Sequence, residues 1–327
     1  MYKNILITGG AGFVGRHVCK KFTDLKCNVL CVDNLMSESS LLPQEWPEHL
    51  KCDNTYFKFI NMDCREYFKH KNQEHFNLII HLAAIVGGRT TIENSPIDVG
   101  EDLSIDAEMF KWAVKYIPDK IVFFSSSAAY PIKFQKNDNN KCKLDESMIN
   151  FNDDNIGIAD LTYGWSKLTG EYLAKLAHEK YGLNVVCYRP FSGYGEDQHT
   201  AYPFPSILNR VLNKEMPINI WSNTYRDFVY IEDAIDCLLD TMESIQDGSA
   251  INIGTGIGTS FEELALHMCK VCNHEAPINI LSNKPTGVFY RVCDPTYSEQ
   301  LGFKPKTSLE EGIKICAKYL LQSKIHK

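Results

Sequence analysis

The feature that most constrains this chain is a glycine-rich turn between a short apolar run and an amphipathic segment. Residues 4–8 predict a buried strand and residues 12–23 a helix. Gly9 lies in the turn between them, and Gly12 and Gly15 lie in the first residues of the helix. A turn with positive φ, a close backbone approach to a ligand and tight helix–strand packing each favour glycine. The helix N-terminus also offers unpaired N–H groups to phosphate. The motif therefore predicts a dinucleotide pyrophosphate site on a strand–turn–helix unit.

Short apolar runs continue to alternate with longer amphipathic stretches through the first half of the chain. Further strands are expected at 28–32, 56–60, 77–81, 120–124 and 184–188. Uninterrupted apolar runs are typical of parallel strands that helices cover on both faces. Because each strand–helix–strand crossover is right-handed, the pattern predicts an α/β fold with a doubly wound parallel sheet, the Rossmann fold.

The texture changes after residue 189, where proline and glycine become frequent and the expected elements are shorter. We expect a dinucleotide-binding domain over 1–188 and a smaller α/β lobe, mainly substrate-binding and partly interleaved with the first, over 189–327. The expected elements of this second part are strands at 218–221, 228–231 and 250–253 and helices near 260–272 and 307–322. Residues 132–160, rich in Asn, Asp and Lys, predict a long surface excursion.

Composition excludes several classes of protein. The 327 residues are 44% hydrophobic and 23% charged, which is typical of a globular protein. No apolar run long enough to span a membrane is present, and no signal peptide precedes the first strand, so we expect a cytoplasmic protein. The net charge of −7 argues against a nucleic-acid partner and leaves a small molecule. Cys269 and Cys272 form the one CxxC pair, and without a second pair we expect no metal.

Two acidic residues follow predicted strands. Asp33 ends the second strand, where a carboxylate accepts the ribose hydroxyls of adenosine and repels a 2′-phosphate. This position predicts NAD, rather than NADP, as the cofactor. Asp63 follows the third strand, where it either contacts adenine or caps the strand end.

A second constellation carries acid–base chemistry. Tyr163 and Lys167 stand four residues apart on one face of a predicted helix. The lysine ammonium and a positive nicotinamide nearby are expected to lower the pKa of the phenol. A tyrosinate then removes a hydroxyl proton while hydride leaves the carbon. A serine cluster at 125–127 ends the fifth strand, at the sheet edge where open α/β sheets bind ligands.

These motifs together resemble the extended short-chain dehydrogenase/reductase family, in its branch of nucleotide-sugar epimerases and dehydratases. The similarity covers nearly the whole chain. Its segments are GGAGFVG at 9–15, 33–35, HLAA at 81–84, the serine cluster before Tyr130 and Pro131, YGWSK at 163–167, Arg189 and Pro190, RDFVYIED at 226–233, KPTG at 284–287 and 291–294.

The resemblance implies roles for individual residues. It implies a catalytic triad of Ser126, with Ser127 as the alternative, Tyr163 and Lys167. Around the glycines and Asp33 it implies further NAD-binding residues, namely Phe13, Val14, Asn34, Asp63, Leu82, Ala83 and Ala84. It implies a substrate site of Gly87, Gly88, Arg89, Ser127, Arg226 and Arg291, the last two at the diphosphate. It also implies a homodimer through helices near 101–116 and 161–180.

The residues after Ser126 separate the reactions of this branch. Dehydratases carry Asp-Glu there, UDP-glucuronate decarboxylases carry Glu in the second position, and GDP-fucose synthase and GDP-mannose 3,5-epimerase carry Cys, whereas this chain has Ser127 and Ala128. We therefore expect epimerisation of a nucleotide hexose through transient oxidation at C4.

Several alternatives stay open. They are a GDP-fucose-synthase-like epimerase/reductase, a 4-dehydrogenase and a sugar dehydratase. The loop at 84–88 and KPTG at 284–287 resemble GDP-fucose synthase and GDP-mannose 3,5-epimerase, and Asp197 or His199 is available to supply a proton. The sequence does not identify the sugar or the nucleotide.

Overall fold

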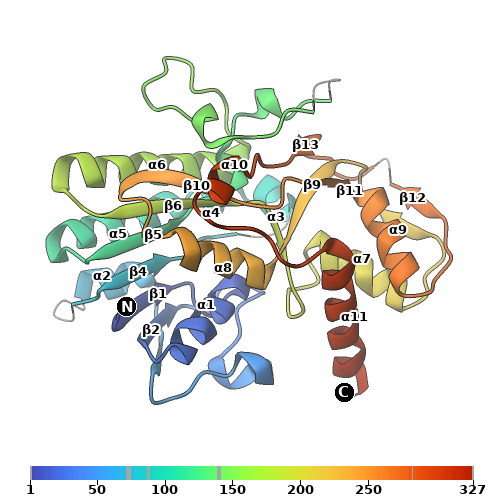
Figure 1. Ribbon diagram of the computed structural model, residues 1–327, viewed down its shortest axis with the longest axis horizontal. Helices are drawn as coiled ribbons and strands as arrows, with labels where there is room; N and C mark the ends of the chain where they lie inside the picture. Colours follow the sequence, from blue (N-terminus) through green and yellow to red (C-terminus); the bar gives the residue numbers. More distant parts are fainter. Residues whose placement is uncertain (1, 71–74, 87–88, 138–140, 282, 326–327) are drawn as a thin grey trace.

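The predicted strands form one parallel sheet of seven strands in the order β10-β6-β5-β4-β1-β2-β3 (Figure 1). The chain moves outward from β1 in both directions, which confirms the doubly wound Rossmann fold. This computed structural model describes residues 2–70, 75–86, 89–137, 141–281 and 283–325. The seven strands are β1 (Asn4–Thr8), β2 (Asn28–Asp33), β3 (Phe57–Asn61), β4 (Leu78–His81), β5 (Lys120–Phe124), β6 (Val185–Pro190) and β10 (Asp247–Ile253).

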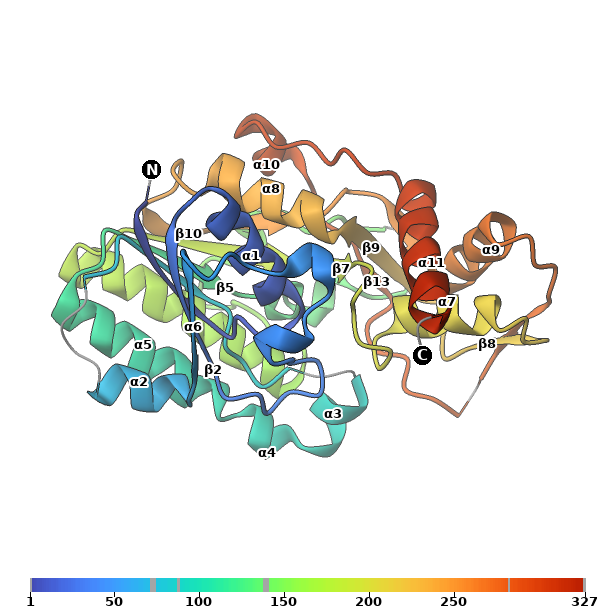
Figure 2. The same cartoon turned by 90° about the horizontal axis from the view of Figure 1, so that it is seen from below.

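Helices cover both faces of the sheet, as Figure 2 shows. One face carries α1 (Phe13–Asp24) and α8 (Ile231–Thr241), and the other carries α2 (Cys64–His70), α5 (Asp102–Tyr116) and α6 (Leu161–Tyr181). Alternation along β1 explains the two cores, because Ile5 and Ile7 pack toward α1 while Leu6 packs toward α5. Each of these side chains is fully buried, which stabilises the fold by about 1.5–3 kcal/mol per side chain.

A smaller lobe stands beside the carboxyl ends of the strands. Its main sheet has the order β11-β9-β13, with β7 also paired to β9, and β8 pairs with β12 in a separate ribbon. Its strands are β7 (Ser192–Tyr194), β8 (Ile218–Ile220), β9 (Tyr225–Tyr230), β11 (Gly258–Ser260), β12 (Ile278–Ile280) and β13 (Tyr290–Arg291). Its helices are α7 (Pro203–Leu212), α9 (Phe261–Val271) and α11 (Leu309–Ile325), while α10 (Thr296–Gln300) contacts β10. The strand expected at 250–253 is β10, which lies in the large sheet.

The segment between β5 and α6 is only partly a surface excursion, and the expectation for 132–160 was wrong in this respect. Leu144 and Ile149 are buried in a third apolar cluster with Tyr130, and a bridge joins Leu144 to Cys293. A few apolar anchors inside a polar stretch give no periodic signal. Short helices in the connections are α3 (Arg89–Asn94), α4 (Pro96–Val99), η1 (Pro43–Glu45), η2 (Glu48–Leu50), η3 (Ser127–Ala129), η4 (Ile132–Phe134) and η5 (Glu146–Met148).

Two properties of the described residues bear on membranes and metals. No helix among the described residues combines the length and apolarity that a membrane crossing requires. Within the same residues, no group of three or more His, Cys, Asp or Glu side chains is arranged to hold a metal ion. None of the twelve cysteines, all of which lie among the described residues, forms a disulfide.

Candidate active site

The glycine turn forms a cradle that side chains would fill. Gly9 has φ of +72°, and a Cβ there would lie 2.6 Å from the backbone nitrogen of Ala83. A Cβ on Gly15 would lie 2.4 Å from the Gly9 carbonyl oxygen, whereas one on Gly12 would keep 3.3 Å from that atom. Gly12 is the N-cap of α1, so the helix N-terminus opens at the cradle, with Phe13 and Val14 in its first turn. A cradle of bare backbone at a helix N-terminus fits a dinucleotide pyrophosphate.

The chain after β4 completes the cradle wall. The Leu82 amide donates to the Thr8 carbonyl at 3.0 Å, and the contact of Gly9 with Ala83 sets the two turns side by side. The predicted cofactor residues Leu82, Ala83 and Ala84 therefore lie next to the glycine turn, although their signal in the sequence was only the family motif.

Asp33 lies at the end of β2 beside the same turn, where only 7% of its surface is exposed. Its carboxylate accepts hydrogen bonds from the amides of Ala11 at 3.0 Å and Leu35 at 2.8 Å, and Asn34 follows it. Burial raises the pKa of Asp33, while both amides and Arg16 oppose that rise. A carboxylate held at this place fits the adenosine ribose of NAD.

Asp63 is held at the end of β3 by Arg65, two residues further along the chain. Its carboxylate accepts from the Arg65 amide at 2.8 Å and pairs with the Arg65 guanidinium at 2.7 Å. Hydrogen bonding to Arg65 holds the pKa of Asp63 below its usual range. Contact with adenine stays a prediction.

Ser126, Tyr163 and Lys167 come together at the carboxyl end of β5, although they belong to different elements. Ser126 caps η3 and accepts from the Ala128 amide at 3.1 Å, and its side chain lies close enough to the Tyr163 hydroxyl to lower the pKa of that phenol. Tyr163 lies in the first turn of α6, and the Lys167 ammonium is 5.9 Å from the centre of its ring. This arrangement suits proton transfer at the phenol oxygen.

The predicted lowering of the Tyr163 pKa is wrong for the protein residues on their own. Burial raises the pKa of this phenol, and Asp102 and Asp106 raise it further. The Lys167 charge and the hydrogen bond to Ser126 lower it, but the net direction is upward. The prediction considered only the charges of the lysine and the nicotinamide, whereas burial and the two carboxylates act only in the folded chain.

The two carboxylates keep Lys167 charged. Burial lowers the pKa of Lys167, yet Asp106, Tyr163 and Asp102 raise it by more, so its net shift is upward. Asp102 accepts from the Ile85 amide at 2.5 Å. Sequence reasoning missed both residues; their signal was a pair of acids spaced by four on the otherwise apolar face of a helix.

His81 extends this buried polar cluster toward β1. Its Nε2 lies 3.2 Å from Asp106 Oδ1, and its Nδ1 lies 2.7 Å from the Thr8 hydroxyl. Burial lowers the pKa of His81 despite Asp106, so the ring is neutral at neutral pH.

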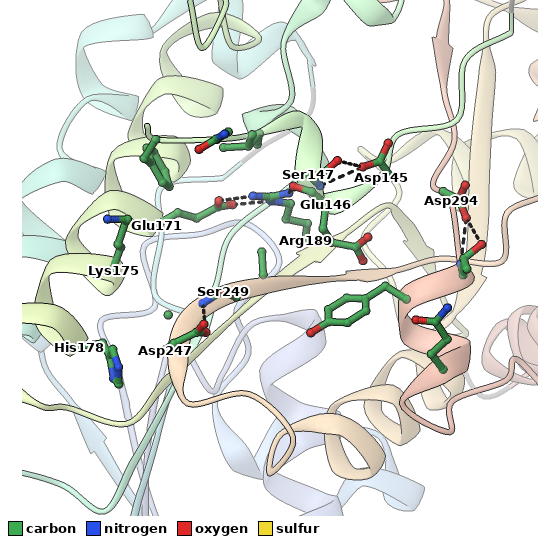
Figure 3. Close-up of a pocket in the computed structure, with 18 of the residues that line it drawn as sticks. Asp145, Glu146, Ser147, Glu171, Lys175, His178, Arg189, Asp247, Ser249 and Asp294 are labelled. Carbon is green, nitrogen blue, oxygen red and sulfur yellow. Dashed lines mark hydrogen bonds and ion pairs between the residues drawn. The ribbon is translucent and has the colours of Figure 1, made fainter. Parts of the chain in front are cut away.

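A buried ion pair contacts the serine loop, which is residues 125–127. Arg189 donates to both carboxylate oxygens of Glu171, at 2.9 and 2.6 Å, and to the Tyr130 hydroxyl at 3.0 Å. Ser125, the neighbour of Ser126, donates to the same Glu171. Figure 3 shows Glu171 and Arg189 in a cavity of about 800 Å³. None of the triad residues lines that cavity, so it is separate from the catalytic cleft.

Arg89, Arg226 and Arg291 gather around one carboxylate. Asp160 pairs with Arg89 at 3.0 Å and with Arg291 at 2.7 Å, and a Cβ on Gly287 would lie within 3.5 Å of both Arg89 and Arg226. The structure thus brings three predicted substrate residues together, while the role of Asp160 went unpredicted. Ser127, the last residue of the serine loop, is buried. Gly87 and Gly88 lie outside the described residues.

Of the two possible proton donors after β7, Asp197 is fully engaged elsewhere. Its carboxylate pairs with Arg16 at 2.7 Å and with His17 at 2.8 Å, and the side chain is 2% exposed. His17 also contacts Glu232 at 2.8 Å. These bonds fasten the loop after β7 to α1. The His199 ring accepts from the Ala201 amide at 3.3 Å.

The His17 cluster predicts a pH dependence of stability. Burial lowers the pKa of His17, but hydrogen bonds to Asp197 and Glu232 raise it by more, to about 9. A folded-state pKa above the unfolded value of 6.5 contributes stability that is complete below pH 6.5 and is lost as the pH rises through 9. We expect the free energy of unfolding to fall by about 3 kcal/mol across that range. Urea titrations at each pH check this, with His17→Gln flattening the profile; an unchanged slope in that variant would contradict the assignment.

Fold and site together define an NAD-dependent enzyme with a Ser-Tyr-Lys triad on a Rossmann sheet. The model of the NAD dependent epimerase/dehydratase family matches residues 5–254. The chain belongs to this family, which confirms the predicted family and NAD as the cofactor.

Individual relatives agree with this placement. A putative UDP-glucose 4-epimerase of Methanocaldococcus jannaschii is 31% identical over 95% of this chain and 96% of its own length. GDP-L-fucose synthase of Sinorhizobium fredii is 25% identical over 95% of this chain and 93% of its own. The structure of UDP-glucose 4-epimerase from Thermotoga maritima superposes with a TM-score of 0.80 at 25% identity, covering 98% of this chain and 99% of that one.

Proposed function

We propose that this protein is an NAD-dependent nucleotide-sugar 4-epimerase that acts on a UDP-hexose. One observation carries the proposal: the Tyr163 hydroxyl lies beside Ser126, Lys167 lies one helical turn away, and the residues following Ser126 are Ser127 and Ala128. Such a site has the base needed to oxidise a carbinol, but Ser127 and Ala128 supply no acid–base pair for removing water.

The chain's own residues perform the proton chemistry. When bound, NAD supplies a hydride acceptor for the sugar C4. Tyr163 takes the proton of the 4-hydroxyl at its phenol oxygen, and the Lys167 ammonium stabilises the phenolate that forms. Ser126 holds the sugar oxygen in line with Tyr163. After the sugar turns over, C4 would regain the hydride on its opposite face while Tyr163 returns the proton to the 4-oxygen, so the reaction causes no net transfer of protons or electrons.

Three arginines would hold the substrate while its sugar turns. Guanidinium groups suit diphosphate oxygens, and Arg226 and Arg291 lie in the smaller lobe while Arg89 lies beside the large sheet. A diphosphate anchored at these residues leaves the hexose free to rotate about its linkage. The UDP moiety is proposed by likeness to the putative UDP-glucose 4-epimerase of Methanocaldococcus jannaschii and the UDP-glucose 4-epimerase of Thermotoga maritima.

An NMR assay in D₂O tests this function. Purified protein is incubated with UDP-glucose, UDP-galactose and UDP-N-acetylglucosamine in turn. We expect interconversion of C4 epimers without a change of mass and without deuterium at carbon, because the same hydride returns. Loss of water would indicate a dehydratase, and deuterium at C3 or C5 would indicate chemistry like that of GDP-fucose synthase; either result would overturn the proposal.

We also propose a cytoplasmic homodimer whose residues 1–188 mainly bind NAD and whose residues 189–327 mainly bind the substrate. Exposed apolar side chains on α5 and α6 support the dimer, namely Leu103 at 44%, Trp165 at 44% and Tyr172 at 43% exposed. A helix pair with such a surface is suited to pairing with a second copy. The placement of Arg226 and Arg291 in the smaller lobe supports the division of roles.

A further inference from the structure

Asp160 stands at a position where its carboxylate would ordinarily cap a helix. It is the N-cap residue of α6, yet its side chain accepts no hydrogen bond from the first turn. An aspartate in this position normally stabilises the helix by about 1 kcal/mol through such a bond. Here Oδ1 and Oδ2 lie 3.0 and 3.1 Å from Arg89 Nη1, and Oδ2 lies 2.7 Å from Arg291 Nη2. The carboxylate is therefore committed to the arginines.

The backbone of Asp160 is fixed independently of its side chain. Its amide donates to the Ala128 carbonyl at 3.0 Å, and its carbonyl accepts from the Gly164 amide at 3.0 Å. These bonds secure the start of α6, and with it Tyr163, against the serine loop. The carboxylate can change partners without displacing the triad.

Three guanidiniums meet two carboxylates around Asp160, because Arg89 also pairs with Glu93 at 2.6 Å, so the positive charge exceeds the negative charge by one. Arg226 donates from Nη1 to the carbonyls of Tyr225 and Val288, and these are uncharged partners. Burial, together with the nearby Arg291 and Arg89, lowers the pKa of Arg226 to about 9, although Asp160 opposes the shift. Buried cations require a counter-charge, so the cluster is built for a further anion.

We propose that Asp160 is a built-in counter-anion of the diphosphate subsite, which holds Arg89 and Arg291 in place and weakens the binding of nucleotide diphosphates by competing for them. This inference rests on the proposed function, because it takes the arginines as the diphosphate ligands. Three guanidiniums without Asp160 would grip any nucleoside diphosphate, including free UDP. Asp160 thus sets the affinity at which substrate enters and product leaves.

Isothermal titration with UDP and with inorganic pyrophosphate tests the proposal. Asp160→Asn keeps the shape of the side chain and removes its charge. We expect it to bind both probes about tenfold more tightly than the wild type, because a negative charge has left a cluster of three cations. The matched control is Asp145→Asn, where the carboxylate does cap its helix, η5, and binding should stay unchanged. Equal or weaker binding by folded Asp160→Asn would overturn the proposal.

A second pair of variants keeps the test decisive if Asp160→Asn folds poorly on its own, because removing Arg89 as well restores the charge balance of the cluster. Arg89→Gln should bind UDP about tenfold more weakly, whereas the double variant Arg89→Gln with Asp160→Asn should return close to the wild type, because the lost charges cancel. Additive weakening would show that Asp160 is a scaffold only.

The outcomes also separate this inference from the proposed function. Wild-type turnover of UDP-hexoses without tighter binding by Asp160→Asn rejects the role of Asp160 alone. Tighter pyrophosphate binding by Asp160→Asn without any turnover of UDP-hexoses rejects the epimerase proposal and supports the counter-anion.

Discussion

Replacing Tyr163 with phenylalanine lowers kcat by about three orders of magnitude while leaving the dissociation constants of NAD and UDP within a factor of about two. The variant keeps the aromatic ring and loses only the phenol oxygen, which lies beside Ser126 and near the Lys167 ammonium. With no other group placed to receive the 4-hydroxyl proton, oxidation at C4 stops. Initial rates of UDP-hexose epimerisation, together with titrations of both ligands, measure the separation.

A second phenol provides the matched control for Tyr163→Phe. Tyr202 lies near enough to Tyr163 for the two to interact electrostatically, and burial followed by that interaction raises the pKa of Tyr202 to about 12. Burial and Tyr163 raise the pKa of Tyr202, and no ammonium group among the described residues opposes them, so Tyr202 is a poor base. Tyr202→Phe should keep kcat within about threefold of the wild type. If Tyr163→Phe retained a tenth of the activity, or if Tyr202→Phe lost most of it, the assignment of the base would be wrong.

The large sheet could be predicted from sequence because its signals are local. Five apolar runs after the first, and a glycine turn between 4–8 and 12–23, determine strand and helix positions without knowledge of distant contacts. The place of β10 in that sheet could not be predicted, because it depends on pairing with β6. The buried anchor Leu144 was equally hidden, since its backbone partners, Val292 and Asp294, come from the chain just after β13.

The site divides in the same way. Tyr163 and Lys167 share one helix, so their spacing alone predicted their proximity. The direction of the Tyr163 pKa depends on Asp102 and Asp106, which come from α5, and on burial by the whole fold. Asp160 gave no signal at all, because its importance arises only when Arg89 and Arg291, far apart in sequence, meet at its carboxylate.

The other large effect is expected at Gly15. In Gly15→Ala the new Cβ lies 2.4 Å from the Gly9 carbonyl oxygen and 2.5 Å from the Gly10 Cα, and both are backbone atoms that cannot rotate away. Helix α1 must then move off the glycine turn. We expect the free energy of unfolding to fall by about 2–3 kcal/mol, and NAD binding to be lost with the geometry of the cradle. Urea unfolding without ligand and titration with NAD measure the two effects.

Gly12→Ala separates the packing of the cradle from its use. A Cβ on Gly12 keeps 3.3 Å from the Gly9 carbonyl oxygen, and its φ of −70° and ψ of 174° suit alanine. Stability should therefore change by less than about 1 kcal/mol. The added methyl still occupies the backbone surface that the pyrophosphate approaches, so NAD affinity should fall by about tenfold or more. Equal losses of stability in the two variants would contradict this account, because the cradle would then depend on glycine for folding alone.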